Sequence, residues 1–422
     1  MNRPDIRRLP KRSDPLKAQA KLLDGVKSKS LLTEKIGLAQ AVGRVLAKDA
    51  YSNINVPAYD KTFIDGYAIN PKTTASASAS KPAAFKVVGK LFPADYPTNA
   101  QVASGEAIYV ACGAPIPKGA ASTVKVEETR LSGDKIEVVR EIKQGEGIIP
   151  LGDDVKQDTL MLKRGQVLRP QDIGLLASIN MREVEVFKKP TLAILSGGDE
   201  LIKQCRKDST KIANNYALVV AGLASELGAA AVLKGIMPDA LDHVKEKIGE
   251  ALAEADIVVT IGGTSVGIKD FIPDAINQLG EPGVVVQGIS LRPGAVSGFG
   301  IVNSKPIVML PGHIGSCIAG LYFFAAPLIR LYCGLDGDGL QPRLTAELSE
   351  AVDSGPQFRF LLLHLRRAEG KLFAEQVEGG SSALTTIVKS NGYAIIPPHR
   401  NLAKGTNVAV YLFGNLELAQ IA

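Results

Sequence analysis

The chain has 422 residues, which is enough for roughly two to four domains with separate hydrophobic cores. Hydrophobic residues make up 45% and charged residues 22%, a balance typical of a folded globular protein rather than a disordered chain. The net charge of +6 is modest, and there is no tryptophan to stack on bases, so we expect no nucleic-acid partner. A moderately basic chain still suits an anionic small-molecule substrate.

The cysteine and histidine content argues against a zinc site. The four cysteines stand far apart, with no pair at metal-ligand spacing, and there are only four histidines. The N-terminus is charged and interrupted by prolines, so it carries no secretory pattern. We therefore predict a cytoplasmic protein with reduced cysteines.

One segment, residues 314–333, is apolar enough to be considered as a membrane span. Its sequence, IGSCIAGLYFFAAPLIRLYC, contains Pro327 and Arg330 and follows Pro311-Gly312. These interruptions favour a helix packed in a protein core, so we expect no membrane partner.

The first third of the chain changes character at Pro57. Residues 14–50 have an amphipathic pattern that predicts helix. Residues 71–82, PKTTASASASKP, are of low complexity and predict an exposed loop. Between Phe85 and Val139, short apolar runs are separated by glycine and proline, which predicts a small β-rich domain.

The remainder divides into three stretches. Residues 141–189 have a mixed pattern, with a helix expected after Pro170. From about 190 to 335, β-branched apolar runs alternate with helical stretches, as expected for βαβ units with a parallel sheet. Residues 336–422 carry short strand patterns and few helix signals, which indicates a small β domain.

Three predicted strands of the α/β stretch end in glycine turns with polar side chains: Ser196-Gly197-Gly198-Asp199-Glu200, Gly262-Gly263-Thr264-Ser265 and Pro311-Gly312-His313. Because carboxyl ends of parallel strands meet at one edge of a sheet, we expect the three turns to line a common site. Their backbone N–H groups suit phosphate oxygens. The nearby carboxylates Asp199, Glu200 and Asp270 suit a hard cation such as Mg²⁺.

These features also have plainer structural explanations. A Gly-Gly turn after a strand is often just a connection to the next helix. Asp199 and Glu200 could serve only to cap the helix that follows. The chain has no GxxxxGK[ST] loop, which disfavours ordinary P-loop phosphoryl transfer. It also has no GxSxG motif, so His313 alone does not indicate a serine hydrolase.

Several sequence blocks, taken in order, resemble a known family. They are LAQAVGRVLAKDAYSNINVPAYDKTFIDGYAI, CGAPIPKGAASTVKVEET, IKQGEGIIPLGDDV, SGGDEL, IGGTSVGIKDF, LRPGAVSGFG and LPGHIGSCIAGLYFFAAPLI. They are similar to the motifs of the molybdopterin molybdenumtransferase family, which comprises the MoeA proteins of prokaryotes and the E domain of gephyrin. Independent blocks in the same order are far more specific than one glycine turn.

The resemblance implies a multidomain α/β fold with four regions. These are an elongated discontinuous domain (1–50 and 141–189), a β-rich insertion domain (51–140), a molybdopterin-binding-like α/β domain with a parallel sheet (190–335) and a C-terminal β-barrel-like domain (336–422). It also implies a homodimer whose active site combines the α/β domain of one subunit with the β-rich regions of the other.

The implied reaction belongs to molybdenum cofactor biosynthesis. Molybdate, or tungstate of nearly equal size, would be inserted into adenylylated molybdopterin, with AMP released and Mg²⁺ assisting. The adenylyltransferase that makes this substrate is a candidate partner. The residues suit this chemistry because phosphates need N–H donors and cations, while a metal ion needs carboxylates.

Site residues can be carried over where the motifs match. The implied catalytic carboxylates are Asp65 (from the second subunit), Glu200 and Asp270, and the implied metal ligands are Asp199, Glu200 and Asp270. The implied substrate contacts are Gly262, Gly263, Ser265, Gly267, Arg292, Pro293, Gly294, Pro311, Gly312, Ser316 and Ser381. Further matching or nearby positions are Glu127, Asp154, Arg359 and Ser382.

Some site positions depart from the family's pattern, and most of the departures remove a polar side chain: Cys112, Ala121, Gly147, Gly197, Ile268, Ala295 and His313-Ile314. These changes fall at the expected site rather than in the core. They leave a second hypothesis open, in which the chain is a paralogue that binds a pterin or nucleotide ligand, or acts as a scaffold, without turnover.

Overall fold

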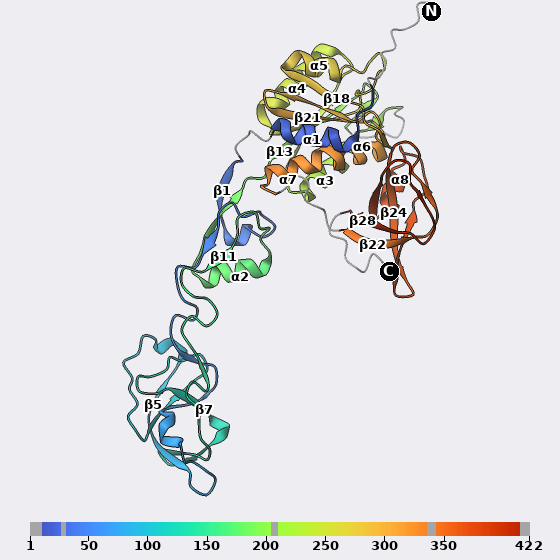
Figure 1. Cartoon of the computed structure of the whole chain (residues 1–422). Helices are drawn as coiled ribbons and strands as arrows, with labels where there is room; N and C mark the ends of the chain where they lie inside the picture. The colour runs from blue at the N-terminus through green and yellow to red at the C-terminus, as the bar shows by residue number, and fades with distance from the viewer. Residues whose placement is uncertain (1–10, 27–30, 204–209, 336–342, 414–422) are drawn as a thin grey trace, which may run out of the picture. The chain divides into compact units, whose positions relative to one another are not determined.

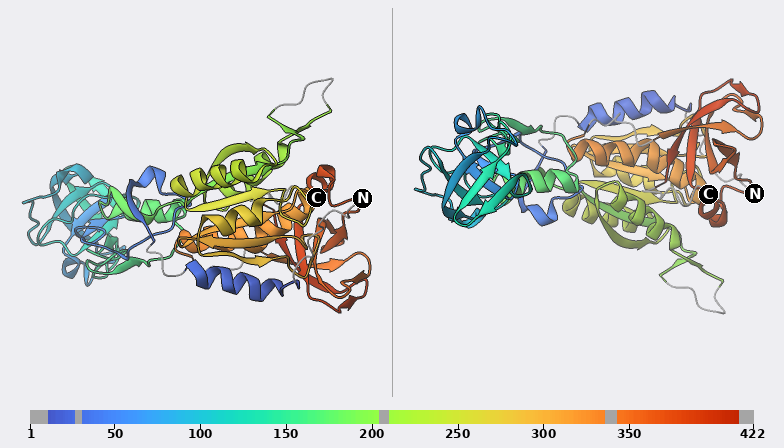
Figure 2. Two further views of the ribbon diagram at one scale, coloured as in Figure 1. Left: turned by 90° about the horizontal axis from the view of Figure 1, so that it is seen from above. Right: turned by 90° about the horizontal axis from the view of Figure 1, so that it is seen from below.

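The computed structural model describes residues 11–26, 31–203, 210–335 and 343–413. The chain divides into two compact units. One comprises residues 35–186, and the other comprises residues 1–34 together with 187–422. Figure 1 traces the elements of both units, and Figure 2 gives two further views.

The unit of residues 35–186 contains a six-stranded sheet of order β7-β4-β6-β5-β9-β8. Its strands are β4 (Gly66–Ile69), β5 (Ala83–Leu91), β6 (Glu106–Val110), β7 (Ser122–Lys125), β8 (Thr129–Ser132) and β9 (Lys135–Val138). Alternate side chains of the strands enter two cores, with Tyr67 and Phe85 in one and Ala68 and Leu91 in the other. The short apolar runs therefore form the β-rich structure that their spacing predicted.

A further core of this unit joins segments that precede and follow the sheet in sequence. Ala41 and Leu46 pack with Leu162, Leu176 and Val186. Two short antiparallel pairs link the same segments, β2 (Ala50–Tyr51) with β11 (Leu160–Leu162) and β3 (Lys61–Thr62) with β10 (Ile148–Ile149). The other elements are β1 (Thr33–Gly37), α2 (Pro170–Ser178) and β12 (Glu183–Phe187).

The N-terminal segment corrects one expectation. We predicted helix over residues 14–50, but α1 spans only Pro15–Val26 and β1 follows at Thr33. Residues 1–34 are grouped by their contacts with 187–422, and the assignment of residues 1–50 to the elongated domain stays a prediction. The apolar face of α1, which includes Leu22, packs on the α/β domain. Helical periodicity shows that a face is buried, but not against which neighbour.

The α/β domain contains a six-stranded sheet of order β16-β13-β17-β21-β20-β18. Four strands are parallel: β13 (Thr191–Gly197), β16 (Ala230–Met237), β17 (Ile257–Ile261) and β21 (Lys305–Leu310). The fifth strand, β20 (Gly298–Val302), is antiparallel to β21, and the edge strand β18 (Pro282–Gln287) is antiparallel to β20, so the sheet is mixed rather than wholly parallel as predicted. Asn303 and Ser304, with φ of 49° and 63°, form a two-residue hairpin that leaves no room for a crossover helix.

Helices cover both faces of this sheet (Figure 1). On one face, α4 (Leu241–Glu254) and α5 (Ile272–Leu279) share a core with the strands that includes Val244, Ile248 and Ile276. On the other face lie α1 and the helical segment that follows β21. α3 (Asn215–Glu226) packs on β13 and β16, and the short strands β14 (Leu201–Ile202) and β15 (Ile212–Ala213) precede it.

The apolar segment after β21 is a core helix, as predicted. It runs without a break through α6 (Ile314–Gly320), the π-helical turn η5 (Leu321–Ala325) and α7 (Ala326–Tyr332). Its length and composition would allow a membrane span, yet 89% of the apolar window is buried inside the protein. It packs against α1 and β21, so its apolar surface is used within the fold.

The C-terminal part is a β-barrel, as predicted. The strand order is β19-β24-β25-β22-β28-β26, and β24 also pairs with β26, which closes the barrel. The elements are β19 (Leu291–Arg292), β22 (Arg343–Leu348), β23 (Val352–Asp353), β24 (Phe358–Ala368), β25 (Lys371–Gln376), α8 (Leu384–Lys389), β26 (Gly392–Ile396), β27 (Asn401–Leu402) and β28 (Asn407–Leu412). Because β19 comes from a loop of the α/β domain, its pairing with β24 ties the two domains together.

The start of α2 generates a prediction. The Asp172 carboxylate is buried and accepts hydrogen bonds from the Arg169 backbone N–H at 2.8 Å and from the Arg169 guanidinium at 3.0 Å. We expect Asp172→Ala to lower the free energy of unfolding by about 1 kcal/mol, because the helix loses this cap. Urea unfolding followed by circular dichroism measures the loss, with the exposed Asp153→Ala as the matched control.

The same contact predicts a pH dependence. The Arg169 guanidinium holds the pKa of Asp172 below its usual value, so the carboxylate stabilises the fold above that usual value. The stabilisation is lost as the pH falls through the lowered pKa. The difference between wild type and Asp172→Ala should therefore shrink below about pH 4. A difference that stays constant from neutral pH to pH 3 would contradict this assignment.

The turn after β17 generates another prediction. Gly262 has a φ of 81°, and a Cβ there would lie 2.9 Å from the Gly197 carbonyl oxygen. We expect Gly262→Ala to destabilise the protein by about 1–3 kcal/mol in urea unfolding. At Gly222, on the exposed side of α3, a Cβ would meet nothing within 4 Å. Gly222→Ala should be neutral or stabilising, and equal unfolding midpoints for the two variants would refute the prediction.

Candidate functional site

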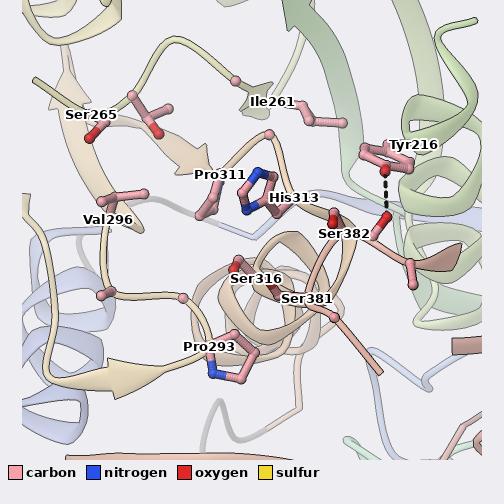
Figure 3. Close-up of a pocket in the computed structure, with 18 of the residues that line it drawn as sticks. Tyr216, Ile261, Ser265, Pro293, Val296, Pro311, His313, Ser316, Ser381 and Ser382 are labelled. Carbon is pink, nitrogen blue, oxygen red and sulfur yellow. Dashed lines mark hydrogen bonds between the residues drawn. The ribbon is translucent and has the colours of Figure 1, made fainter. Parts of the chain in front are cut away.

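A cavity of about 1280 Å³ lies at the carboxyl ends of the parallel strands (Figure 3). One side is formed by the loops that follow β13, β17 and β21. The barrel forms the other side through β24, the end of β25 and the segment around Ser381. Both sides belong to the same compact unit.

The three glycine turns meet because their strands are neighbours in the sheet. β17 lies between β13 and β21, and the Gly262 backbone N–H donates to the Leu310 carbonyl at 2.9 Å. A Cβ on Gly312 would lie 3.6 Å from the Gly262 Cα, so the second and third turns are in close contact. The structure thus confirms that the three turns line one site.

Most of the predicted substrate-binding residues line this cavity: Gly262, Gly263, Ser265, Arg292, Pro293, Gly294, Pro311, Gly312, Ser316 and Ser381. Glu200, Asp270, Arg359 and Ser382 line it as well. Gly267 and Asp199 do not line the cavity but contact residues that do. Gly267 N–H donates to the Asp270 carboxylate at 2.6 Å, and Asp199 contacts Lys269.

A lysine offsets part of the negative charge on the side of the cavity formed by the strand-end loops. Lys269 Nζ lies 3.0 Å from Asp199 Oδ2 and 3.9 Å from Asp239 Oδ2. The hydrogen bond from Lys269 lowers the pKa of Asp199, while burial raises the pKa of Asp239. The hydrogen bond to Asp199 also raises the pKa of Lys269, so its ammonium is charged at neutral pH.

The predicted Mg²⁺ ligands are not brought together as a ligand set. One Asp270 oxygen accepts the Gly267 N–H, and the Asp199 carboxylate binds Lys269 and the Asp239 backbone N–H. Among the described residues there is no group of three or more His, Cys, Asp or Glu side chains placed to hold a metal ion. These residues therefore do not fit a Mg²⁺ site built from Asp199, Glu200 and Asp270.

The barrel side of the cavity is basic. Arg292 of β19 is the direct strand partner of Arg359 of β24, and both line the cavity together with Arg12. The Arg359 guanidinium donates to the Asp353 carbonyl at 2.8 Å and to the Gln376 side chain at 3.1 Å. Burial, and then the charge of Arg292, lower the pKa of Arg359. Two arginines that are strand partners and both line the cavity are suited to binding an oxyanion.

The segment around Ser381 is held to the α/β domain by two hydrogen bonds. Tyr216 of α3 donates its hydroxyl to the Ser382 carbonyl at 3.1 Å, as drawn in Figure 3. The Gly315 backbone N–H donates to the Ser381 carbonyl at 2.7 Å. The barrel residues of the cavity are thus anchored on the same domain that supplies the glycine turns.

The sequence predictions missed several lining residues: Arg12, Asn214, Tyr216, Asp239, Lys269 and Gln376. Asp239 had a usable signal, because it follows the parallel strand β16 and so reaches the same edge of the sheet. The buried Ser196 hydroxyl donates a hydrogen bond to the Asn214 side-chain oxygen at 2.8 Å, and the two residues are eighteen positions apart in sequence. Arg12 and Gln376 come from distant segments and had no local signal.

The remaining predicted acidic residues lie in the unit of residues 35–186. Asp65 is exposed, and its Oδ1 accepts the Cys112 backbone N–H at 3.0 Å. Glu127 and Asp154 are exposed as well. The roles of these three carboxylates stay predictions.

Comparison with protein families matches nearly the whole chain. Residues 15–180 match the MoeA N-terminal region (domains I and II), residues 193–331 match a probable molybdopterin binding domain, and residues 345–413 match the MoeA C-terminal region (domain IV). The three matches follow one another in the order that the sequence blocks indicated.

Relatives and solved structures indicate the same family as these matches. The chain is 31% identical to a molybdopterin molybdenumtransferase of Staphylococcus aureus over 301 residues, 71% of each chain. It is 29% identical to that of Bacillus subtilis over 393 residues, 90% of each chain. A crystal structure of a molybdopterin biosynthesis MoeA protein from Pyrococcus horikoshii matches with a TM-score of 0.82 and 29% identity, covering 94% of this chain and 99% of that one. The chain belongs to the molybdopterin molybdenumtransferase family, the MoeA proteins.

Proposed function

We propose that this transferase inserts molybdate, or tungstate, into adenylylated molybdopterin and releases AMP. Membership of the family and the names of its relatives support a role in molybdenum cofactor biosynthesis. They favour this enzymatic role over the alternative of a non-catalytic paralogue or scaffold. The observation that carries the proposal is the cavity itself, with glycine turns on one side and paired arginines on the other.

The two sides suit the two reactants. Backbone N–H groups at Gly263 and Gly312 suit the phosphates of the nucleotide-linked substrate, because amides at strand ends attract anions. Arg292 and Arg359 suit molybdate, a tetrahedral dianion. Binding both in one cavity would place the dithiolene sulfurs next to the molybdenum.

The chemistry balances with these two reactants and water. The two thiol sulfurs bond to molybdenum, and one molybdate oxygen leaves as water with the two thiol protons. A second water attacks a phosphorus of the pyrophosphate link, the bond to the bridging oxygen breaks, and AMP departs. Asp270, which keeps one oxygen beside the cavity, is the proposed acceptor of the proton from the attacking water, with Glu200 as a second carboxylate.

The finer predictions from the family resemblance remain part of this proposal. Asp65 would be contributed by the second subunit of a homodimer, and the adenylyltransferase that makes the substrate is the candidate partner. Mg²⁺ would enter bound to the substrate phosphates rather than to a protein ligand set, and no step above depends on it. The protein would act in the cytoplasm.

The arginine pair is tested by molybdate dependence. Purified protein is given adenylylated molybdopterin with increasing molybdate, and AMP release is measured. We expect Arg292→Met and Arg359→Met each to raise the molybdate concentration for half-maximal rate by about tenfold or more, because each removes a charge-assisted contact. Arg343→Met, in the barrel but outside the cavity, is the matched control. Folded wild-type protein that releases no AMP would refute the proposed activity itself.

Asp270 is tested separately. Asp270→Asn keeps the size of the side chain but cannot accept a proton, so we expect kcat for AMP release to fall about a hundredfold. Asp242→Asn, at the start of α4 and outside the cavity, should leave it unchanged. An unchanged kcat in Asp270→Asn would show that another group takes the proton.

A further inference from the structure

The loops after three neighbouring parallel strands are joined by one charged cluster. Asp199 follows β13, Asp239 follows β16 and Lys269 follows β17. The two aspartates exchange hydrogen bonds, because the Asp239 backbone N–H donates to Asp199 Oδ1 at 3.1 Å and the Asp199 backbone N–H donates to Asp239 Oδ2 at 3.3 Å. The two carboxylates are therefore held close together by the backbone.

Two carboxylates held in this way need a cation between them. Two negative charges held this close repel each other unless a cation offsets them. The Lys269 ammonium lies beside both carboxylates, at 3.0 Å from Asp199 and 3.9 Å from Asp239. A divalent ion on these oxygens would stand within a few ångströms of the ammonium and be repelled by it.

We infer that Lys269 is a built-in counter-ion of the Asp199–Asp239 pair and excludes a divalent cation from this edge of the cavity. The position is distinctive because Asp199 is a residue that the family resemblance assigns to Mg²⁺. Lys269 also lines the cavity, so the same ammonium faces the space for an anionic ligand. For the proposed reaction, a protein side chain thus supplies the positive charge at this point. The exclusion itself is a property of the free protein and can be tested without any substrate.

The test is a titration with Mn²⁺, whose free concentration is measured by electron paramagnetic resonance, on the full chain at neutral pH. If Lys269 holds the place of a cation, Lys269→Ala should bind Mn²⁺ at least about tenfold more tightly than wild type, since one nearby positive charge is gone. Lys269→Arg keeps the charge and should bind Mn²⁺ as weakly as wild type. Circular dichroism confirms that each variant is folded.

A double variant locates the site. Adding Asp199→Asn to Lys269→Ala should abolish the gain, because the carboxylate that would bind Mn²⁺ is removed. Equal Mn²⁺ affinity in wild type and Lys269→Ala, whether tight or absent, would overturn the inference, and so would a gain that survives Asp199→Asn. Because no substrate is present, this result is independent of whether the protein releases AMP.

Discussion

The site depends on the register of three parallel strands. Ser196 of β13 pairs with Ile261 of β17, and Ile261 in turn pairs with Leu310 of β21. Each of these residues is at or next to the last position of its strand, so the three strands end side by side at the same edge of the sheet. The glycine turns that follow then meet at one edge, where their backbone amides are close together. A slip of one residue in either pairing would move one turn along the strand direction, away from its neighbour.

The Lys269 cluster adds charge to this backbone arrangement. The sheet brings the loops after β16, β13 and β17 side by side, and the Asp199–Asp239 exchange then fixes two of them. Lys269 joins the third loop to them. Because Lys269 and Asp199 are both exposed, this contact contributes little to stability, and its effect is on the local charge. This edge of the cavity therefore presents an ammonium beside the carboxylates that the family resemblance led us to expect.

Sequence reasoning was most successful where a local pattern has one structural meaning. Apolar β-branched runs ending in glycine predicted β13, β17 and β21 and their common edge, and the sequence blocks predicted the barrel. The mixed sheet was missed because Asn303 and Ser304 adopt positive φ without the glycine that usually marks such a hairpin. The contact of Lys269 with Asp199 spans seventy positions of sequence, and only the strand order brings the two residues together.

The barrel side of the cavity shows that a site residue can be predicted from sequence while its partner in the site cannot. The resemblance assigned a basic contact to Arg292, but its pairing with Arg359 arises from β19, a two-residue strand that leaves the α/β domain to join the barrel. Burial, and then the charge of Arg292, lower the pKa of Arg359, and an anion that binds both arginines would relieve this repulsion. On the opposite side, Lys269 offsets part of the negative charge of Asp199 and Asp239. For the proposed reaction, the arginines would offer charged donors to an oxyanion, while the glycine turns would offer neutral backbone donors to a phosphate.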